Sequence, residues 1–196
     1  MLHRCAEMLT DKLFQVCNIE NSKSPVFIYG FELALSTISS IISILVISAC
    51  LSILPTAIVF LISFCSLRMF CGGYHAKTYG RCFILTNIVY IVTIGCAFIS
   101  ERYLLKVPLL IIGAVSLFFS VITIFVLAPV KNIHHPLSQE KYLKNRKRAC
   151  VLSVTLLLFT AFVLFLGKEN TFVVISFTLT AVAVMMIVPK LQERRT

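Results

Sequence analysis

The chain has 196 residues, of which 59% are hydrophobic and only 13% are charged, with a mean hydropathy of +0.96. This composition excludes an ordinary soluble domain, which is about half apolar and about a quarter charged. The net charge of +10 comes from cations in short segments between apolar runs, which favours anionic lipid headgroups over nucleic acid as their partner. We therefore expect residues 1–196 to form a single integral membrane domain.

The first 25 residues are predicted to form an amphipathic segment. Apolar side chains recur along residues 1–19 with the spacing of one helical face, which comprises Leu2, Cys5, Ala6, Leu9, Leu13, Val16 and Cys17. The stretch lacks the continuous apolar centre of a signal peptide. Periodicity does not identify what the face covers, so two alternatives stand: the membrane headgroup region, or loops of the protein itself.

Six apolar runs follow, and a helix needs about 20 such residues to cross a membrane. They cover residues 26–54, 56–70, 83–100, 107–130, 149–167 and 172–188. The second run is short for a span. The sequence therefore predicts an all-α membrane protein, a polytopic bundle of about six transmembrane helices with an N-terminal amphipathic interfacial helix.

A carboxylate lies within the first run, and a proline follows its end. Glu32 falls in its first turns, where a charge is costly unless protein or water surrounds it. We expect an interfacial helix start with a solvated acid; the alternative is that Glu32 approaches a reactive site. Pro55 is expected to mark a tight turn before the second run.

The cations indicate how the runs cross the membrane. If the N-terminus is cytoplasmic, the outer turns carry only Arg102, Lys106 and Lys168, and every other Lys or Arg faces inward. Cytoplasmic loops of membrane proteins carry such an excess of cations. Both termini, residues 68–82 and a basic loop at 131–148 are therefore predicted on the cytoplasmic side.

Residues 68–82 (RMFCGGYHAKTYGRC) bring reactive side chains, glycines and cations together between two apolar runs. We expect a reactive cytoplasmic loop here, because Cys82 and His75 are the two parts of a cysteine-type acyl-transfer site. On one continuous helix these residues would stand about 10 Å apart along the axis, so a reacting pair requires a break in the helix. The break is assigned to the glycines of the segment, Gly72, Gly73 and Gly80.

Cys82 is predicted to stand at the start of a membrane helix. Unpaired backbone N–H groups and the helix dipole favour a thiolate at such a position, and the same groups suit a developing oxyanion. Arg81 and Lys77 add positive charge beside it.

Other interpretations of the segment stand beside this one. Cys71 is a second candidate nucleophile, and both reactive groups are also compatible with structural roles at a membrane surface. Zinc would be held by Cys71, His75 and Cys82 with His134 or His135, but this spacing is unusual for zinc and we expect no metal. No Asp stands nearby to orient His75; the remaining candidates are Glu32, Asn87, Ser138 and Gln139.

The segment resembles the accessory gene regulator B (AgrB) family of bacterial membrane cysteine endopeptidases. The resemblance rests on the pattern R-x-x-x-G-G-x-H-A-x(5)-C, carried by Arg68, Gly72, Gly73, His75, Ala76 and Cys82. A second matching segment follows the fourth run and reads LAPVKNIHHPLSQEKYLK, similar to the family's AP-[VI]-x(5)-P-L-[ST] stretch.

The resemblance implies a concrete activity at the bacterial cytoplasmic membrane. Such proteins remove the C-terminal tail of a small AgrD-type propeptide through an acyl-enzyme, and the peptide then cyclises to a thiolactone or lactone autoinducer. Cys82 would be the nucleophile and His75 the general base, with Arg68 and Gly73 required for processing and no role for Cys71. Gly72, Lys77 and Arg81 complete the expected supporting set.

The expected partners are the propeptide, anionic lipid headgroups and a second copy of the chain in a homodimer. No cofactor is expected, because a thioester keeps the carbonyl activated and the chain has no P-loop pattern. The rival function is a small transporter or exporter without covalent catalysis. That function needs polar residues deep in the spans, and the runs offer few, chiefly Ser and Thr.

Overall fold

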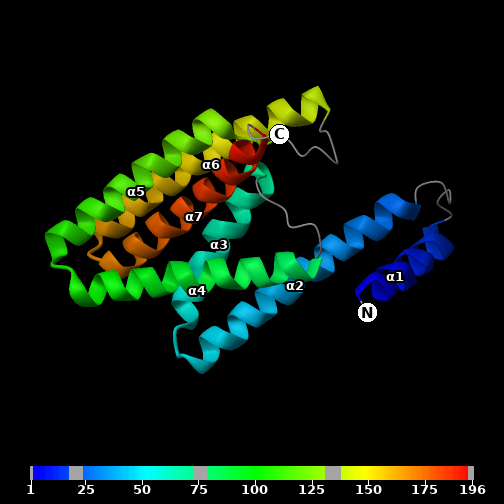
Figure 1. Cartoon of the computed structure of the whole chain (residues 1–196), viewed down its shortest axis with the longest axis horizontal. Helices are drawn as coiled ribbons and strands as arrows, with labels where there is room; N and C mark the ends of the chain where they lie inside the picture. The colour runs from blue at the N-terminus through cyan, green and yellow to red at the C-terminus, as the bar shows by residue number, and fades with distance from the viewer. Residues whose placement is uncertain (1, 18–23, 73–78, 131–137, 194–196) are drawn as a thin grey trace. The chain divides into compact units, whose positions relative to one another are not determined.

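The computed structural model describes residues 2–17, 24–72, 79–130 and 138–193 (Figure 1). These residues form seven helices: α1 (Leu2–Cys17), α2 (Ser24–Cys50), α3 (Leu54–Cys71), α4 (Tyr79–Tyr103), α5 (Lys106–Leu127), α6 (Gln139–Phe165) and α7 (Glu169–Glu193). The last six are long and apolar enough to cross a membrane, which confirms the predicted all-α class and the six spans. The short second run is the full helix α3.

The chain divides into two compact units, which are described separately. The first unit contains α1, α2 and the beginning of α4 as far as Ile88. The second contains α3, the rest of α4 from Val89, and α5, α6 and α7.

In the first unit, α1 packs against α2. Ala6 and Thr10 lie one turn apart and are fully buried, and the Phe14 ring meets the Phe27 ring of α2 edge to face at 5.4 Å. The apolar face of α1 was predicted to cover headgroups or loops, but its partner in the protein is the helix α2. That face is only partly buried, because Leu9 remains 41% exposed.

Glu32 is also placed differently from the prediction of a solvated acid. Glu32 is only 8% exposed, and one of its carboxylate oxygens lies 2.7 Å from Nδ1 of His3 on α1. A second helix therefore covers this carboxylate and supplies its hydrogen bond, which removes the cost of leaving a charge buried without a partner.

Pro55 does not form the turn after α2. The turn occupies residues 51–53, where Ser52 has a φ of 58°, and Pro55 lies in the first turn of α3. A proline suits that position because the first N–H groups of a helix have no intrahelical partner.

The second unit is built around α7, which packs against α3, α5 and α6 and is the most buried of the six spans (Figure 1). It packs tightly against α5 at Gly113, where an added β-carbon would stand 2.4 Å from the Phe172 ring. Further along the same pair, the hydroxyls of Ser120 and Thr180 are hydrogen-bonded at 3.0 Å. Small residues and interhelical hydrogen bonds are the usual means by which membrane helices associate.

The basic loop predicted at 131–148 is partly helical, because α6 begins at Gln139. Ser138 caps the helix by accepting a hydrogen bond from the backbone N–H of Lys141, and Glu140 pairs with Lys144 at 2.6 Å one turn apart. The cations from Lys141 onward therefore stand on helical turns. Residues 131–137, which include His134 and His135, lie outside the described part of the chain.

Candidate active site

The reactive segment at 68–82 is helical at both ends. Residues 68–71 form the last turn of α3, and residues 79–82 form the first turn of α4. His75, Gly73 and Lys77 lie outside the described residues, so the proposed contact between His75 and Cys82 stays a prediction.

Of the three glycines to which the break in the helix was assigned, the structure describes Gly72 and Gly80. Gly72 ends α3 with a φ of 68° and a ψ of −140°, a region that residues with a side chain rarely adopt. Gly80 does not contribute, because it lies within the first turn of α4. The prediction of a break at Gly80 is therefore wrong.

Cys82 is the fourth residue of α4 and is half-buried. The first four N–H groups of a helix have no intrahelical partner, and negative charge is favoured at that end of the dipole. The neighbouring Arg81 is exposed on the same first turn. The carbonyl of Cys82 is engaged further along the helix, accepting a hydrogen bond from the Thr86 hydroxyl at 3.0 Å. This turn thus offers a reachable thiol beside backbone N–H groups and a cation.

Three of the four residues considered for orienting His75 already have structural partners. Asn87 is buried, donating to the carbonyl of Phe83 at 2.9 Å and accepting from the Ser43 hydroxyl at 2.9 Å. Glu32 is bonded to His3, and Ser138 caps α6. The fourth, Gln139, is exposed in the first turn of α6.

Arg68 stands in the last turn of α3 and lies against α7. One guanidinium nitrogen is 3.5 Å from the sulfur of Met185, and the guanidinium carbon is 5.8 Å from the centre of the Phe64 ring. Both contacts lie in the second unit. The cation therefore helps to hold the end of α3 in place.

Cys71, the alternative thiol, is completely buried at the end of α3. Its carbonyl accepts a hydrogen bond of 2.9 Å from the backbone N–H of Val130, the residue two positions beyond the cap of α5. A nucleophile must be reachable by substrate, so burial argues against Cys71 in that role. The zinc alternative also needs His75 and a histidine at 134 or 135, which lie outside the described residues.

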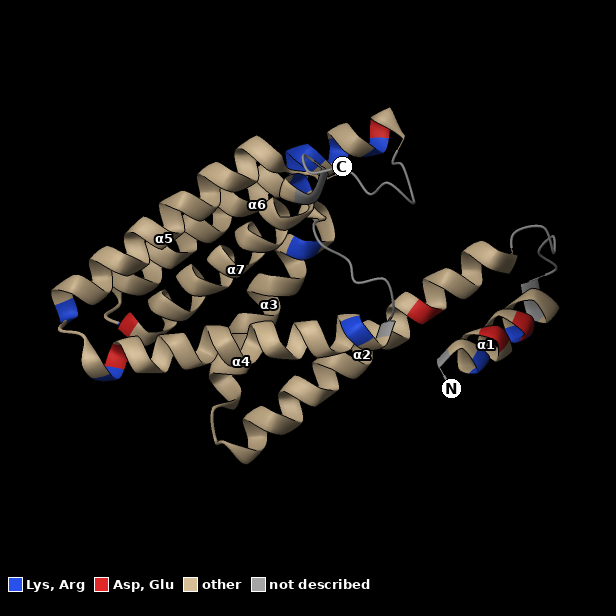
Figure 2. Cartoon of the chain, viewed as in Figure 1, with Lys and Arg blue, Asp and Glu red and all other residues tan. Residues whose placement is uncertain are grey.

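Cations gather at one end of the second unit (Figure 2). They stand in the last turns of α3 and α7 and the first turns of α6, and comprise Arg68, Lys190, Lys141, Lys144, Arg146, Lys147 and Arg148. At the other end Lys106 and Glu169 form an ion pair at 3.2 Å. The described charges are therefore strongly asymmetric along this unit.

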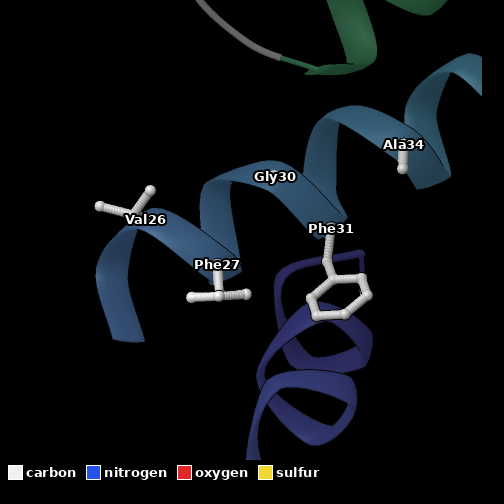
Figure 3. Close-up of a pocket in the computed structure, with 5 residues that line it drawn as sticks. All are labelled: Val26, Phe27, Gly30, Phe31 and Ala34. Atoms are coloured by element: carbon white, nitrogen blue, oxygen red, sulfur yellow. The ribbon is translucent and has the colours of Figure 1, made fainter. Parts of the chain in front are cut away.

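A groove of about 380 Å³ lies on α2 in the first unit (Figure 3). It is lined by Val26, Phe27, Gly30, Phe31 and Ala34, and Figure 3 shows the Phe31 ring directed toward α1. None of these five side chains can act as a nucleophile, acid or base, so the groove has no catalytic capacity of its own.

Known proteins and protein families match this chain over most of its length. The family described as Accessory gene regulator B (AgrB) matches residues 6–187. A protein of Clostridium perfringens (strain 13 / Type A) described as AgrB-like protein 2 is 27% identical over 162 residues, covering 81% of this chain and 75% of that protein. An AgrB-like protein of strain SM101 is 26% identical with the same coverage.

A further relative of strain 13, described as AgrB-like protein 1, is 30% identical over 114 residues, which is 58% of this chain and 56% of that protein. No solved structure matches the chain. The family match spans nearly all seven helices, including both segments on which the resemblance was based. This multi-pass membrane protein therefore belongs to the accessory gene regulator B (AgrB) family.

Proposed function

We propose that this protein is a membrane cysteine endopeptidase that removes the C-terminal tail of an AgrD-type propeptide and releases the remainder as a cyclic thiolactone or lactone. The observation that carries the proposal is the AgrB match over residues 6–187, because it includes the whole segment from Arg68 to Cys82.

The proposed reaction has two acyl transfers. The Cys82 sulfur attacks the carbonyl carbon of the scissile peptide bond while His75 takes the thiol proton. Collapse of the tetrahedral adduct breaks the C–N bond, His75 gives the proton to the leaving amine, and the peptide remains on Cys82 as a thioester. A thiol or hydroxyl of the bound peptide then attacks the thioester carbonyl and closes the ring. The C–S bond to Cys82 breaks, and the proton of the attacking group passes through His75 to the released Cys82 sulfur.

The first turn of α4 supports Cys82 as the nucleophile. The thiol is half-buried, whereas the thiol of Cys71 is fully buried. Backbone N–H groups at a helix start suit the negative oxygen of the tetrahedral adduct. We assign Arg81 and Lys77 to attraction of an acidic propeptide tail, and Arg68, Gly72 and Gly73 to support of the segment.

The charge distribution supports an orientation in the membrane. We propose that the basic end of the second unit faces the cytoplasm, together with both termini and the reactive segment. Lys and Arg gather on the cytoplasmic side of membrane proteins, and anionic headgroups on that side are their natural partners.

The transporter alternative has no specific observation in its favour. Within the described spans, Glu32 is the one charged residue that is buried, and it is bonded to His3. The buried hydroxyls of Ser40 and Ser176 donate to carbonyls one turn back in their own helices, at 3.0 Å and 2.8 Å. Hydroxyls bonded in this way are satisfied within their own helices and are not by themselves evidence for a solute path.

The test uses the full chain in liposomes with a candidate AgrD-type propeptide, followed by mass spectrometry. Wild type and Cys71→Ala should both produce the free tail and a second peptide whose mass is that of the cyclic product. Cys82→Ala should produce neither. Cleavage by Cys82→Ala at the wild-type rate would refute the proposal.

A further inference from the structure

The two segments that carry the family resemblance meet at the end of α3. The N–H of Val130 donates to the carbonyl of Cys71 at 2.9 Å, joining positions 59 residues apart within the second unit. The last four carbonyls of a helix have no intrahelical partner, and Cys71 is fully buried. The N–H of Val130 therefore satisfies a carbonyl that would otherwise be buried without a hydrogen bond.

Gly72 is what allows the two backbones to come so close. A β-carbon at this position would stand 3.0 Å from the Val130 oxygen and 3.6 Å from its nitrogen. Both atoms are backbone, so they cannot turn away as a flexible side chain would. The positive φ of Gly72 adds a second reason why a larger residue is unsuitable here.

Both partners stand on firmly held parts of the second unit. On the α5 side, Ala128 is buried and its N–H bonds to the Ile124 carbonyl at 2.9 Å. On the α3 side, the guanidinium of Arg148 on α6 lies 5.7 Å from the centre of the Phe70 ring. The point at which the chain leaves α3 is therefore fixed by helices α5 and α6.

We propose that Gly72 and Val130 are positioning residues for the peptidase reaction: the close approach of Gly72 to Val130, together with the hydrogen bond from Val130 to Cys71, fixes the end of α3 at which the reactive segment begins. This inference rests on the proposed function. His75 follows Gly72 by three residues in the sequence, so the chain that connects it to the anchored end of α3 is at most about 11 Å long. Val130 acts through its N–H and not through its side chain.

The test measures kcat and KM for propeptide cleavage by the full chain in liposomes. Gly72→Ala should lower kcat about tenfold or more with KM nearly unchanged, because a small displacement of a catalytic group has a large effect on rate. Gly95→Ala is the matched control, since Gly95 lies within α4 away from the reactive segment and a β-carbon added there would meet no atom within 4 Å, and it should retain wild-type kcat.

The hydrogen bond is tested by replacing Val130 with α-hydroxyisovaleric acid, which substitutes an ester oxygen for the N–H and keeps the side chain. This replacement should lower kcat in the same way as Gly72→Ala. Val130→Ala keeps the N–H and should retain activity. Thermal midpoints measured in parallel separate a loss of rate from a loss of folded protein.

Each outcome bears on one proposal. If Cys82→Ala abolishes cleavage but Gly72→Ala and the ester replacement keep wild-type kcat, the positioning role is refuted and the peptidase stands. A rise in KM at constant kcat would make the contact a binding element and would also refute positioning. Equal losses in Val130→Ala and the ester replacement would assign the effect to the side chain and refute the role of the N–H.

Discussion

The imidazole of His3 lies between two carboxylates. Its Nδ1 is 2.7 Å from Glu32 on α2, and its Nε2 is 3.1 Å from Glu7 on α1. A carboxylate only accepts hydrogen bonds, so both ring nitrogens donate when the imidazole is protonated. The hydrogen bond to Glu32, with a smaller contribution from the charge of Glu7, raises the pKa of His3 above its usual value near 6.5.

Docking of α1 on α2 should therefore weaken as the pH rises. A raised pKa in the docked state means that the contribution is fully present below about pH 6.5 and is lost as the pH passes the higher value. Hydrogen exchange of the α1 amides, corrected for the intrinsic effect of pH, should show less protection at about pH 8 than at about pH 6.

Two variants serve as controls for this pH effect. Glu32→Gln should remove most of the dependence, and Glu7→Gln should remove less of it, following the order of the two contributions. Equal protection of α1 in wild type at both pH values would contradict the role assigned to the His3–Glu32 pair.

The thiols of Cys71 and Cys82 should differ in reactivity. Cys71 is fully buried whereas Cys82 is half-buried, so a maleimide reagent should modify Cys82 in the folded protein and leave Cys71 unmodified. Peptide mapping by mass spectrometry reads both sites in one sample. Cys5, which is exposed on α1, provides a reference for a freely reactive thiol. Modification of Cys71 as fast as Cys5 would show that the end of α3 is open.

The orientation can be checked with two single-cysteine variants. Lys147 and Lys168 are both exposed, and they lie near opposite ends of α6. In intact cells a membrane-impermeant maleimide should label Lys168→Cys and should label Lys147→Cys only after the membrane is permeabilised. The reverse pattern would place the basic end of the second unit outside.

Gly113→Ala should destabilise the second unit. The added methyl group would overlap the buried Phe172 ring, and overpacking of this kind costs about 1–3 kcal/mol. Gly95→Ala is the control, since no atom lies within 4 Å of a β-carbon built there. Thermal unfolding in detergent should show a lower midpoint for Gly113→Ala alone; equal midpoints would mean that α5 and α7 separate easily.

The sequence was sufficient for the six spans because an apolar run of about 20 residues has few stable alternatives in a bilayer. It was less reliable at helix ends, where single residues determine the boundary of the helix. Ser138 caps α6 well before the apolar part begins, and Pro55 starts α3 where a turn was expected. Both signals are visible in the sequence, since Ser is a preferred N-cap and Pro a preferred first-turn residue.

Contacts between distant positions were not accessible in the same way. The partner of Glu32 is 29 residues away, and periodicity along α1 gave no reason to select His3. The contact of Gly72 with Val130 was missed for the same reason, although both belong to the two segments with family resemblance. Two separate family motifs in one chain often contact each other, and that expectation could have identified the contact of Gly72 with Val130.

The burial of α7 among α3, α5 and α6 has a consequence for biosynthesis. Its three partners leave the ribosome before it does, so they enter the bilayer with the surfaces meant for α7 still covered by lipid. Assembly of the second unit therefore waits for the last of the six spans. In a nascent chain arrested before Glu169, helices α3, α5 and α6 would lack their packing partner α7. We expect cellular proteases to remove such a chain faster than the full chain.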